Sequence, residues 1–203
     1  MIYSLRRRIV QYQRWGLARS ARIAVDKAVL TAARRVFGFH EWHAQAPTSL
    51  RTYRIGLAAM AKDIRAKVVV EVGCGLGSVL ARIDAPVRVG YDVDAGVIRA
   101  AAALRSRAIT FRVGGFPDVV EPAIDLLIAV NWLHDFSPDQ LDQWFTRILS
   151  RTRYLIVDSI SPTSPTPYRY FHDFEFLRDR TTCLRTETLG ETHRAFMLFE
   201  VNV

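Results

Sequence analysis

The segment VVVEVGCGLGSVL, residues 68–80, combines residue types that suit the binding of a nucleotide-like ligand. An apolar run ends at Val72, and three glycines follow at alternate positions, Gly73, Gly75 and Gly77. Because glycine permits positive φ angles and lets a ligand lie against bare backbone, this spacing predicts a ligand-binding turn after a strand. A dinucleotide fingerprint has its third glycine one position later, where the sequence has Ser78, and this argues against NAD.

A carboxylate stands where it can reach the sugar of such a ligand. The next apolar run, 87–91, leads into the sequence YDVD, and Asp92 lies 19 residues beyond Gly73. From the end of a neighbouring strand, a carboxylate can accept hydrogen bonds from two ribose hydroxyls. The glycine turn and Asp92 together predict a nucleoside site.

A histidine follows a later apolar run and is our first candidate for proton transfer. In NWLHDF, His134 comes shortly after the run 124–130, with Asp135 beside it. A neutral imidazole can take a proton from a hydroxyl near pH 7, and a carboxylate can orient it. We expect His134 to be a general base oriented by Asp135; the alternative is a histidine that lines the pocket without taking a proton.

Two aromatic segments are candidates for contact with a second substrate. YRYFHDFEFL contains Tyr170, His172 and Asp173, and FHEWH contains Trp42 and His43. We expect these residues to contact the substrate, with His172 as the rival base; for each of them simple packing is the alternative. No spacing of histidines and cysteines is typical of a metal site, so no metal is expected.

The elements that would position these residues alternate between two patterns. Apolar runs predict strands at 68–72, 87–91, 109–113, 124–130 and 154–157, and helical patterns lie at 77–83, 95–105 and 138–149. In the last helix Ser137 is a suitable cap and Pro138 suits the first turn. Strands that alternate with helices predict an α/β fold with a doubly wound, mostly parallel sheet.

The two ends of the chain differ from this pattern. After a proline-rich loop at 160–167, the runs around 182–189 and 194–201 predict an antiparallel hairpin that completes the sheet. Residues 36–66 are expected to form helical cover over the C-terminal edge of the sheet. We therefore expect one domain, 36–203, preceded by an arm, 1–35.

The arm carries the charge of the whole chain. The net charge is +8, and residues 1–35 hold nine basic side chains against one acidic one, whereas the rest is balanced. Its apolar residues have helical spacing, with Leu5, Ile9 and Tyr12 on one stripe, and Ile23, Val29 and Leu30 follow. A basic amphipathic helix suits three roles: a cap packed on the domain, a contact with an anionic membrane, or, less well, a nucleic-acid contact.

Composition favours a globular protein of the cytoplasm. Half of the 203 residues are apolar and 24% are charged, which excludes a disordered or fibrous chain. No apolar run approaches the roughly 18 residues of a membrane span, and the first residues make a poor secretory signal. With only two cysteines, a disulfide framework is not expected. We expect a cytoplasmic location, with the inner membrane face as an attachment point for the arm.

These motifs, in this order, resemble those of the class I S-adenosylmethionine-dependent methyltransferases over residues 67–160. EVGCGLG matches the first motif of that family, YDVD the second and NWLHDF the fourth-strand motif, whereas RVGGFPD matches the third only in part. The resemblance implies a Rossmann-like sheet of seven strands with a reversed last strand, N-terminal helices and S-adenosylmethionine as cofactor.

The resemblance also implies roles for individual residues. Glu71 faces the amino end of the methionine, Asp92 binds the ribose and Val93 lies against the adenine. Asn131 lies beside the transferable methyl group. The remaining expected cofactor contacts are Gly73, Cys74, Gly75 and Gly77 in the first motif, and Gly115 and Phe116 in the third. Gly115 stands where the family commonly has an acidic residue.

A narrower resemblance suggests the acceptor. FGFHEWH, EVGCGLG, NWLHDF and YFHDFEFL occur together in small bacterial methyltransferases associated with surface-polysaccharide genes, which implies a sugar hydroxyl on a glycan or lipid-linked saccharide. A small-molecule or nucleic-acid acceptor is the alternative, although NWLH lacks the Asn/Asp-Pro-Pro-aromatic motif frequent in RNA N-methylation. A non-catalytic cofactor-binding or assembly subunit is the third possibility.

Overall fold

The computed structural model describes residues 16–45, 47, 49–164, 168–189 and 193–202. Short runs rich in valine and isoleucine form its strands, as expected for β-branched side chains on a pleated surface. The strands are β1 (Val68–Val72), β2 (Val87–Asp92), β3 (Ile109–Val113), β4 (Ile124–Ala129), β5 (Thr152–Ile160), β6 (Thr181–Glu187) and β7 (Arg194–Val201).

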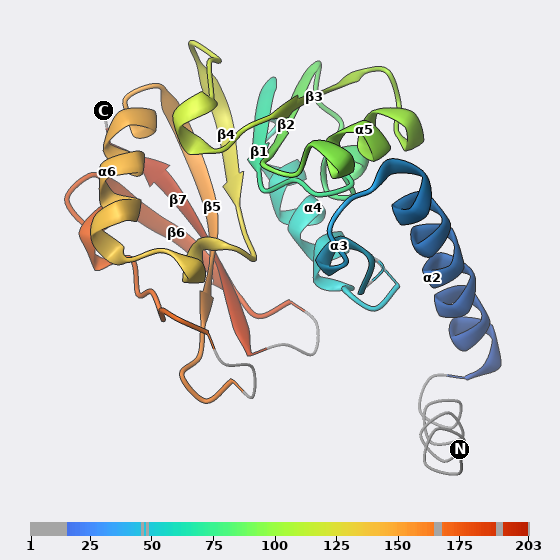
Figure 1. Ribbon diagram of the computed structural model, residues 1–203. Coiled ribbons are helices and arrows are strands. Elements are labelled where there is room, and N and C mark those ends of the chain that lie inside the picture. The colour runs from blue at the N-terminus through green and yellow to red at the C-terminus, as the bar shows by residue number, and fades with distance from the viewer. Residues whose placement is uncertain (1–15, 46, 48, 165–167, 190–192, 203) are drawn as a thin grey trace.

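All seven strands belong to one sheet, in the order β3-β2-β1-β4-β5-β7-β6 (Figure 1). Strands β1 to β5 pair in parallel, and β7 runs antiparallel to both of its neighbours, β5 and β6. The predicted doubly wound sheet with a C-terminal antiparallel hairpin is therefore confirmed. The order reverses between β1 and β4, and in open α/β sheets the crevice outside the carboxyl ends of such strands is the usual ligand site.

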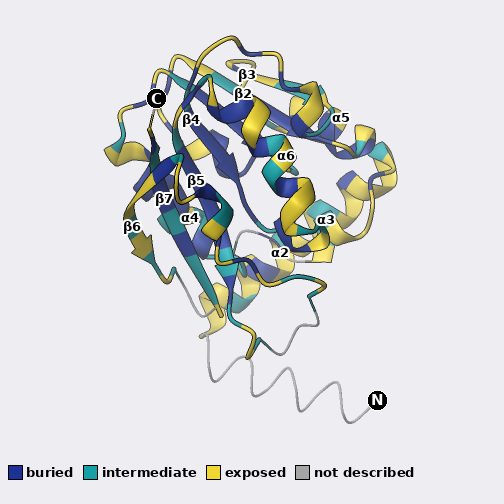
Figure 2. Ribbon diagram, turned by 90° about the vertical axis from the view of Figure 1, so that its left-hand side faces the viewer, coloured by how far each residue is buried: buried dark blue, intermediate teal, exposed yellow. Residues whose placement is uncertain are grey.

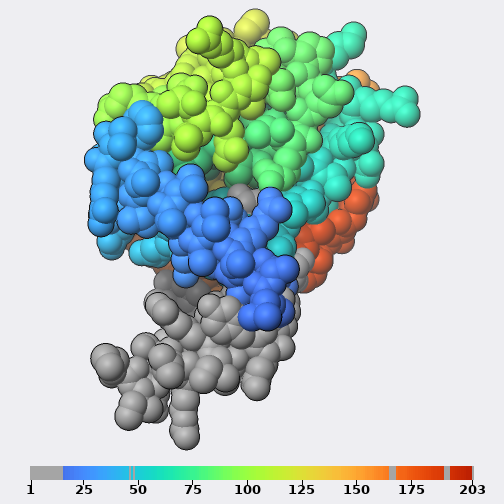
Figure 3. Space-filling view, turned by 90° about the vertical axis from the view of Figure 1, so that its right-hand side faces the viewer, coloured from blue at the N-terminus to red at the C-terminus, as the bar shows by residue number. Residues whose placement is uncertain are grey.

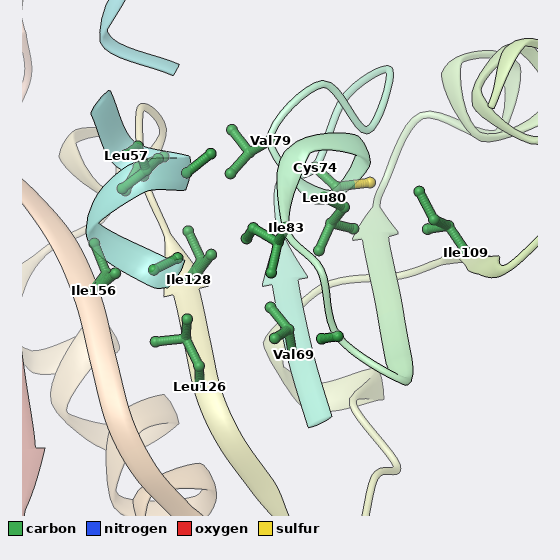
Figure 4. Packing of buried hydrophobic residues seen from close by; sticks show 14 of the residues in the cluster. Leu57, Val69, Cys74, Val79, Leu80, Ile83, Ile109, Leu126, Ile128 and Ile156 are labelled. Carbon is green, nitrogen blue, oxygen red and sulfur yellow. The ribbon is translucent and has the colours of Figure 1, made fainter. Parts of the chain in front are cut away.

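Helices cover both faces of the sheet. They are α2 (Leu17–Phe37), α3 (Trp42–Gln45), α4 (Tyr53–Asp63), α5 (Ala95–Leu104) and α6 (Pro138–Leu149). Alternate side chains along each strand enter opposite cores, as the pleat requires: Leu126 and Ile128 pack with Leu57 of α4 (Figure 4), whereas Leu127 packs with Phe145 of α6. Buried residues line both sides of the sheet in Figure 2.

The predicted start of α6 is confirmed in detail. The Ser137 hydroxyl accepts the backbone N–H of Gln140, the Gln140 side chain accepts the backbone N–H of Ser137, and Pro138 occupies the first turn. Such a reciprocal cap satisfies two of the N–H groups that a helix leaves unpaired at its start.

The predicted helix at 77–83 is wrong. Residues 73–79 form turns, and only a short 3-10 helix, Leu80–Arg82, follows them. The whole connection from β1 to β2 spans 73–86, close to the minimum for a parallel crossover. Because the glycine turn occupies its first part and the return to β2 its last, too few residues remain for an α-helix.

The N-terminal helices occupy two different places. Helix α4 packs against the face of the sheet, and α3 lies near the carboxyl ends of β1 and β2, where it meets the glycine turn. Helix α2 ends at Gly38, whose left-handed conformation and N–H bond to the Arg34 carbonyl close the last turn. The part of the predicted arm that precedes residue 16 lies outside the described residues.

Candidate active site

The turn after β1 depends on its three glycines. Gly73, Gly75 and Gly77 have φ values of 75°, 52° and 64°, a region that other residues rarely adopt. A Cβ atom at Gly73 would lie 2.3 Å from the Trp132 ring, and one at Gly77 would lie 2.6 Å from the Phe111 ring. Near a Cβ atom at Gly75, the described residues place the His43 ring, at 3.4 Å. The middle of the turn is therefore the part that faces α3.

Glu71 is a buried carboxyl next to this turn. Its side chain is 3% exposed, and Oε2 has no hydrogen-bond partner among the described residues. Burial raises the pKa of Glu71 to about 8, although the Arg54 charge and a backbone hydrogen bond from Leu80 act in the opposite direction. Glu71 is thus mostly protonated at neutral pH, and a cationic group at Oε2 would favour its ionised form.

Asp92, at the end of β2, ties the turn to the second strand. Its Oδ2 accepts the N–H of Gly75 at 2.9 Å, and its Oδ1 accepts the N–H of Asp94 at 3.0 Å. The side chain is buried. Since a carboxylate oxygen has two lone pairs, each oxygen retains acceptor capacity for a further hydroxyl.

His43 of α3 lies against this carboxylate. Its Nε2 is 3.9 Å from Asp92 Oδ1 and 3.7 Å from Asp94 Oδ2. Burial lowers the pKa of His43, and the two carboxylates partly offset that effect. The N–H of His40 donates to Asp94 Oδ2 at 2.7 Å and holds the segment before α3 in place. The sequence predicts that His43 contacts the acceptor; the structure places its ring beside the Asp92 carboxylate.

Trp42 lies at the rim of this region. Its ring is 42% exposed and carries the Arg51 guanidinium 4.9 Å above its centroid. This geometry is that of a cation–π contact. The exposed part of the ring remains available to a ligand.

Three further residues expected to contact the cofactor, Val93, Gly115 and Phe116, follow the ends of β2 and β3. Val93 is 78% exposed, and its Cγ1 is 3.8 Å from the position of a Cβ on Gly115. The N–H of Gly115 donates to Asp118 Oδ2 at 2.8 Å. The Phe116 ring instead packs on the α6 side of the sheet, in contact with the Trp132, Trp144 and Phe145 rings.

Cys74 also points away from the cleft. Its Sγ lies 2.7 Å from the position of a Cβ on Gly90, so the thiol fills the space that this glycine leaves in β2. Burial raises the pKa of the thiol well above its ordinary value. Cys74 therefore contributes backbone to the turn and packing to the core.

A second cluster lies at the ends of β4 and β5. Asn131 has a φ of 73°, and its N–H donates to Asp158 Oδ1 at 2.8 Å. Asp158 is fully buried and pairs with Arg194 of β7, whose Nη2 donates to the Tyr168 hydroxyl at 2.7 Å. Burial raises the pKa of Asp158, and Arg194 opposes this shift. We call these four residues with His134 the acceptor-side cluster.

His134 is buried within this cluster. Its Nε2 has no hydrogen-bond partner among the described residues and lies 4.0 Å from Asp158 Oδ2, and its ring meets the Tyr168 ring edge-on at 4.7 Å. Burial and the Arg194 charge lower its pKa to about 3, so the ring is neutral at physiological pH. Asp135, the expected orienting residue, is exposed; the carboxylate next to the imidazole is that of Asp158.

The segment around His172 fastens the polypeptide over the tip of β4. His172 Nε2 lies 3.1 Å from the Leu133 carbonyl, which can only accept, so Nε2 is the donor; Nδ1 has no partner among the described residues. The N–H of Tyr170 donates to the His134 carbonyl at 3.0 Å. Asp173 is exposed and caps Glu175 through its Oδ1.

The structure thus groups the predicted residues in two clusters. Glu71, the glycine turn, Asp92 and His43 form one; Asn131 and His134 belong to the other, with His172 behind it. Sequence reasoning missed Asp158 and Arg194; it placed Tyr168 only in the aromatic segment expected to contact the substrate. Asp158 offered a weak signal, a carboxylate directly after the apolar run 154–157, whereas no local pattern pointed to Arg194. Within the described residues, no three histidine, cysteine or acidic side chains stand together as metal ligands.

Comparisons with known proteins identify the fold. No family model and no curated protein match the sequence. Solved structures match the fold: that of magnesium protoporphyrin IX methyltransferase from Synechocystis, crystallised with S-adenosylhomocysteine, has a TM-score of 0.60 at 17% identity over 75% of this chain and 83% of its own.

Two further structures are similar to the same degree. The PH0226 protein from Pyrococcus horikoshii has a TM-score of 0.63 at 17% identity, over 81% of this chain and all of its own. The methyltransferase domain of bacterial CtHen1 has a TM-score of 0.61 at 14% identity, over 74% of this chain and 97% of its own. The chain therefore has the Rossmann-like fold found in class I methyltransferases.

Proposed function

We propose that this protein is an S-adenosylmethionine-dependent methyltransferase. The observation that carries the proposal is Glu71, a buried carboxyl without a partner for Oε2, placed beside a positive-φ glycine turn that Asp92 anchors. The likeness of fold to structures crystallised with S-adenosylmethionine and S-adenosylhomocysteine supports it.

The residues present fit this cofactor. The unpartnered Oε2 of Glu71 fits the ammonium group of the methionine part, because a cation offsets the cost of ionising a buried acid. The spare acceptor capacity of Asp92 fits the two ribose hydroxyls. A ribose held there would meet the His43 imidazole, which lies 3.9 Å from the same carboxylate.

The chain's own contribution to transfer is alignment and proton removal. When bound, S-adenosylmethionine supplies a methyl group on a positively charged sulfonium. An in-line transfer then needs an acceptor oxygen held in position and relieved of its proton. Nε2 of His134, which has no partner among the described residues, is the atom that would accept that proton; the charge of Asp135 raises the pKa of the ring and favours its protonated form, and Asp158 Oδ2 lies 4.0 Å away.

The acceptor that we propose is a sugar hydroxyl on a glycan or a lipid-linked saccharide. The acceptor-side cluster offers a phenol, an imidazole and a guanidinium for hydroxyl groups, and exposed aromatic surface on Trp42 suits the apolar face of a sugar ring. The motif resemblance to polysaccharide-associated methyltransferases favours the same class. A cytoplasmic location belongs to this proposal.

Asp92→Ala is expected to weaken S-adenosylmethionine binding by about 10- to 150-fold, the equivalent of about 1.5–3 kcal/mol for hydrogen bonds to a charged group. Titration calorimetry measures the loss directly. The matched control is Asp125→Ala. Asp125 also accepts two backbone N–H groups, those of Lys67 and Val68, but it lies at the amino ends of the strands, away from the glycine turn. If both variants lose the same cofactor affinity, the loss reflects an effect on folding, and Asp92 does not bind the ribose.

His134→Ala is expected to lower turnover by about 10²-fold while cofactor affinity stays within a few fold, since a lost general base costs at least that much. Because the pKa of His134 is about 3, the rate of the wild-type enzyme should show no limb from this group between about pH 5 and 9. His172→Ala should instead raise the KM of the acceptor, because His172 holds the segment over the cleft.

Steady-state kinetics of both variants, with the exposed His193→Ala as a control, separate these roles. If His172→Ala lowers turnover and His134→Ala does not, the base is His172. Full activity in both variants would mean that alignment alone drives the reaction.

A further inference from the structure

Helix α2 presents an apolar stripe that no described element covers. Val25, Val29 and Val36 are 62%, 52% and 75% exposed, and Leu17, near the start of the helix, is 78% exposed. The valines are four and seven residues apart, a spacing that puts them on one side of a helix. In Figure 3, α2 lies along the surface of the molecule, in blue.

The buried side of α2 consists of other residues. Ile23 and Ala33 are buried, and Leu30 is half-buried, so these residues form the inner side of α2. Val29, four residues before Ala33, lies next to this inner side, and the exposed stripe that it forms with Val25 and Val36 is here called the outer side. The helix therefore has two apolar sides, and packing on the domain accounts for only one of them.

The charge of α2 favours an anionic partner. The helix carries five basic side chains against one acidic one, Asp26, and they are Arg19, Arg22, Lys27, Arg34 and Arg35. Arg22 lies seven residues, or about two helical turns, before Val29 and is therefore on the same side of the helix as the stripe. A soluble helix seldom exposes such a stripe among cations, whereas helices that lie in the headgroup region of a membrane have this composition.

Helix α2 is fastened to the part of the domain that holds the site. The Arg99 guanidinium donates to the Phe37 carbonyl at 3.0 Å, and Gly96 of α5 lies against the backbone of Phe37 and Phe39, where a Cβ would be 2.9 Å away. Helix α3 and His43 follow directly. A surface bound by α2 would therefore lie beside the cleft.

We infer that the outer side of α2, with Val25, Val29, Val36 and Arg22, binds the surface of an anionic lipid membrane. The valines enter the boundary between headgroups and acyl chains, and Arg22 contacts lipid phosphates. This inference does not depend on the methyl-transfer reaction.

Sedimentation of the full chain with vesicles tests the inference. At low salt the protein is expected to pellet with vesicles of phosphatidylcholine and phosphatidylglycerol and to stay in solution with phosphatidylcholine alone. Val25→Glu/Val29→Glu should lower the partition coefficient at least tenfold. The control, Val120→Glu/Leu184→Glu, makes the same change of charge and apolarity at exposed positions elsewhere and should bind like wild type.

A neutral variant separates apolar from purely electrostatic binding. Val25→Ser/Val29→Ser should weaken vesicle binding severalfold while circular dichroism and cofactor binding stay unchanged. The inference is overturned if the wild type does not bind anionic vesicles, or if the serine variant binds them equally well. Binding to duplex DNA that outcompetes the vesicles would also overturn it, as would a self-association that the glutamate variant abolishes without any vesicle binding.

Discussion

Glu71→Gln is expected to weaken S-adenosylmethionine binding by about 10- to 150-fold, the equivalent of about 1.5–3 kcal/mol for a hydrogen bond to a charged group. It should also abolish the pH dependence of binding. In the free protein burial holds the pKa of Glu71 near 8, so the group is protonated at slightly acidic pH. An ammonium group at Oε2 favours the ionised form, and binding therefore expels a proton.

The sign of the pH effect follows from that proton. Because the bound state holds fewer protons, wild-type affinity should rise with pH, by up to about tenfold per unit between about pH 5.5 and 7. Calorimetry at one pH in two buffers of different ionisation enthalpy measures the proton release, which we expect to be close to one for wild type and zero for Glu71→Gln. Equal proton release in both proteins would contradict the role of Glu71.

The same substitution provides a readout without any ligand. The pKa of Glu71 is raised above its ordinary value of 4.5, so its contribution to stability is present at low pH and is lost as pH rises towards 8. The free energy of unfolding of Glu71→Gln should therefore fall less over this range than that of wild type. Glu175→Gln, at an exposed position, should follow wild type.

Asp158→Ala is expected to destabilise the fold by about 3–5 kcal/mol, the usual cost of leaving one charge of a buried pair without its partner. The substitution would leave the Arg194 guanidinium buried and unpaired, and the Asn131 N–H would lose its acceptor. Urea unfolding followed by circular dichroism measures the loss.

Two comparisons make this expectation specific. Asp142→Ala removes the acid of the Arg180–Asp142 pair, which is partly exposed, and should cost only about 0–1 kcal/mol. Asp158→Leu/Arg194→Met replaces both charges by apolar groups and should recover much of the lost stability. If Asp158→Ala and Asp142→Ala lower the free energy of unfolding by similar amounts, the buried pair contributes no more to stability than the partly exposed one.

Features that depend on neighbouring residues were predictable from the sequence. Valine-rich runs bounded by turn residues predicted the strands. Ser137 before α6 and Pro138 in its first turn predicted where that helix begins. The alternate glycines predicted the turn beside Asp92. Each of these signals lies within a few residues of the structure that it produces.

Features that depend on distant pairing were not predictable. The run 154–157 gave a strand that is too short, because Asp158 is polar; β5 continues to Ile160 since Asp158 pairs with Phe196 of β7. That register places Arg194 next to Asp158, and no local sequence pattern predicts this contact. His43 reached Asp92 for a similar reason, through the path of the chain after α2. The helix expected at 77–83 does not form because the connection between β1 and β2 is too short for it, whatever the helix propensity of its residues.

The position of β7 has a consequence for how the protein reaches its working state. It is the last strand in the sequence, yet it lies between β5 and β6 in the sheet. During synthesis, a chain that still lacks residues 194–201 can form the glycine turn and its contact with Asp92, but it leaves Asp158 without Arg194. Because Arg194 is synthesised well after Asp158, the turn beside Asp92 is expected to form before the Asp158–Arg194 pair, and proteolytic loss of the C-terminal strand would remove that pair while leaving the residues of the turn in place.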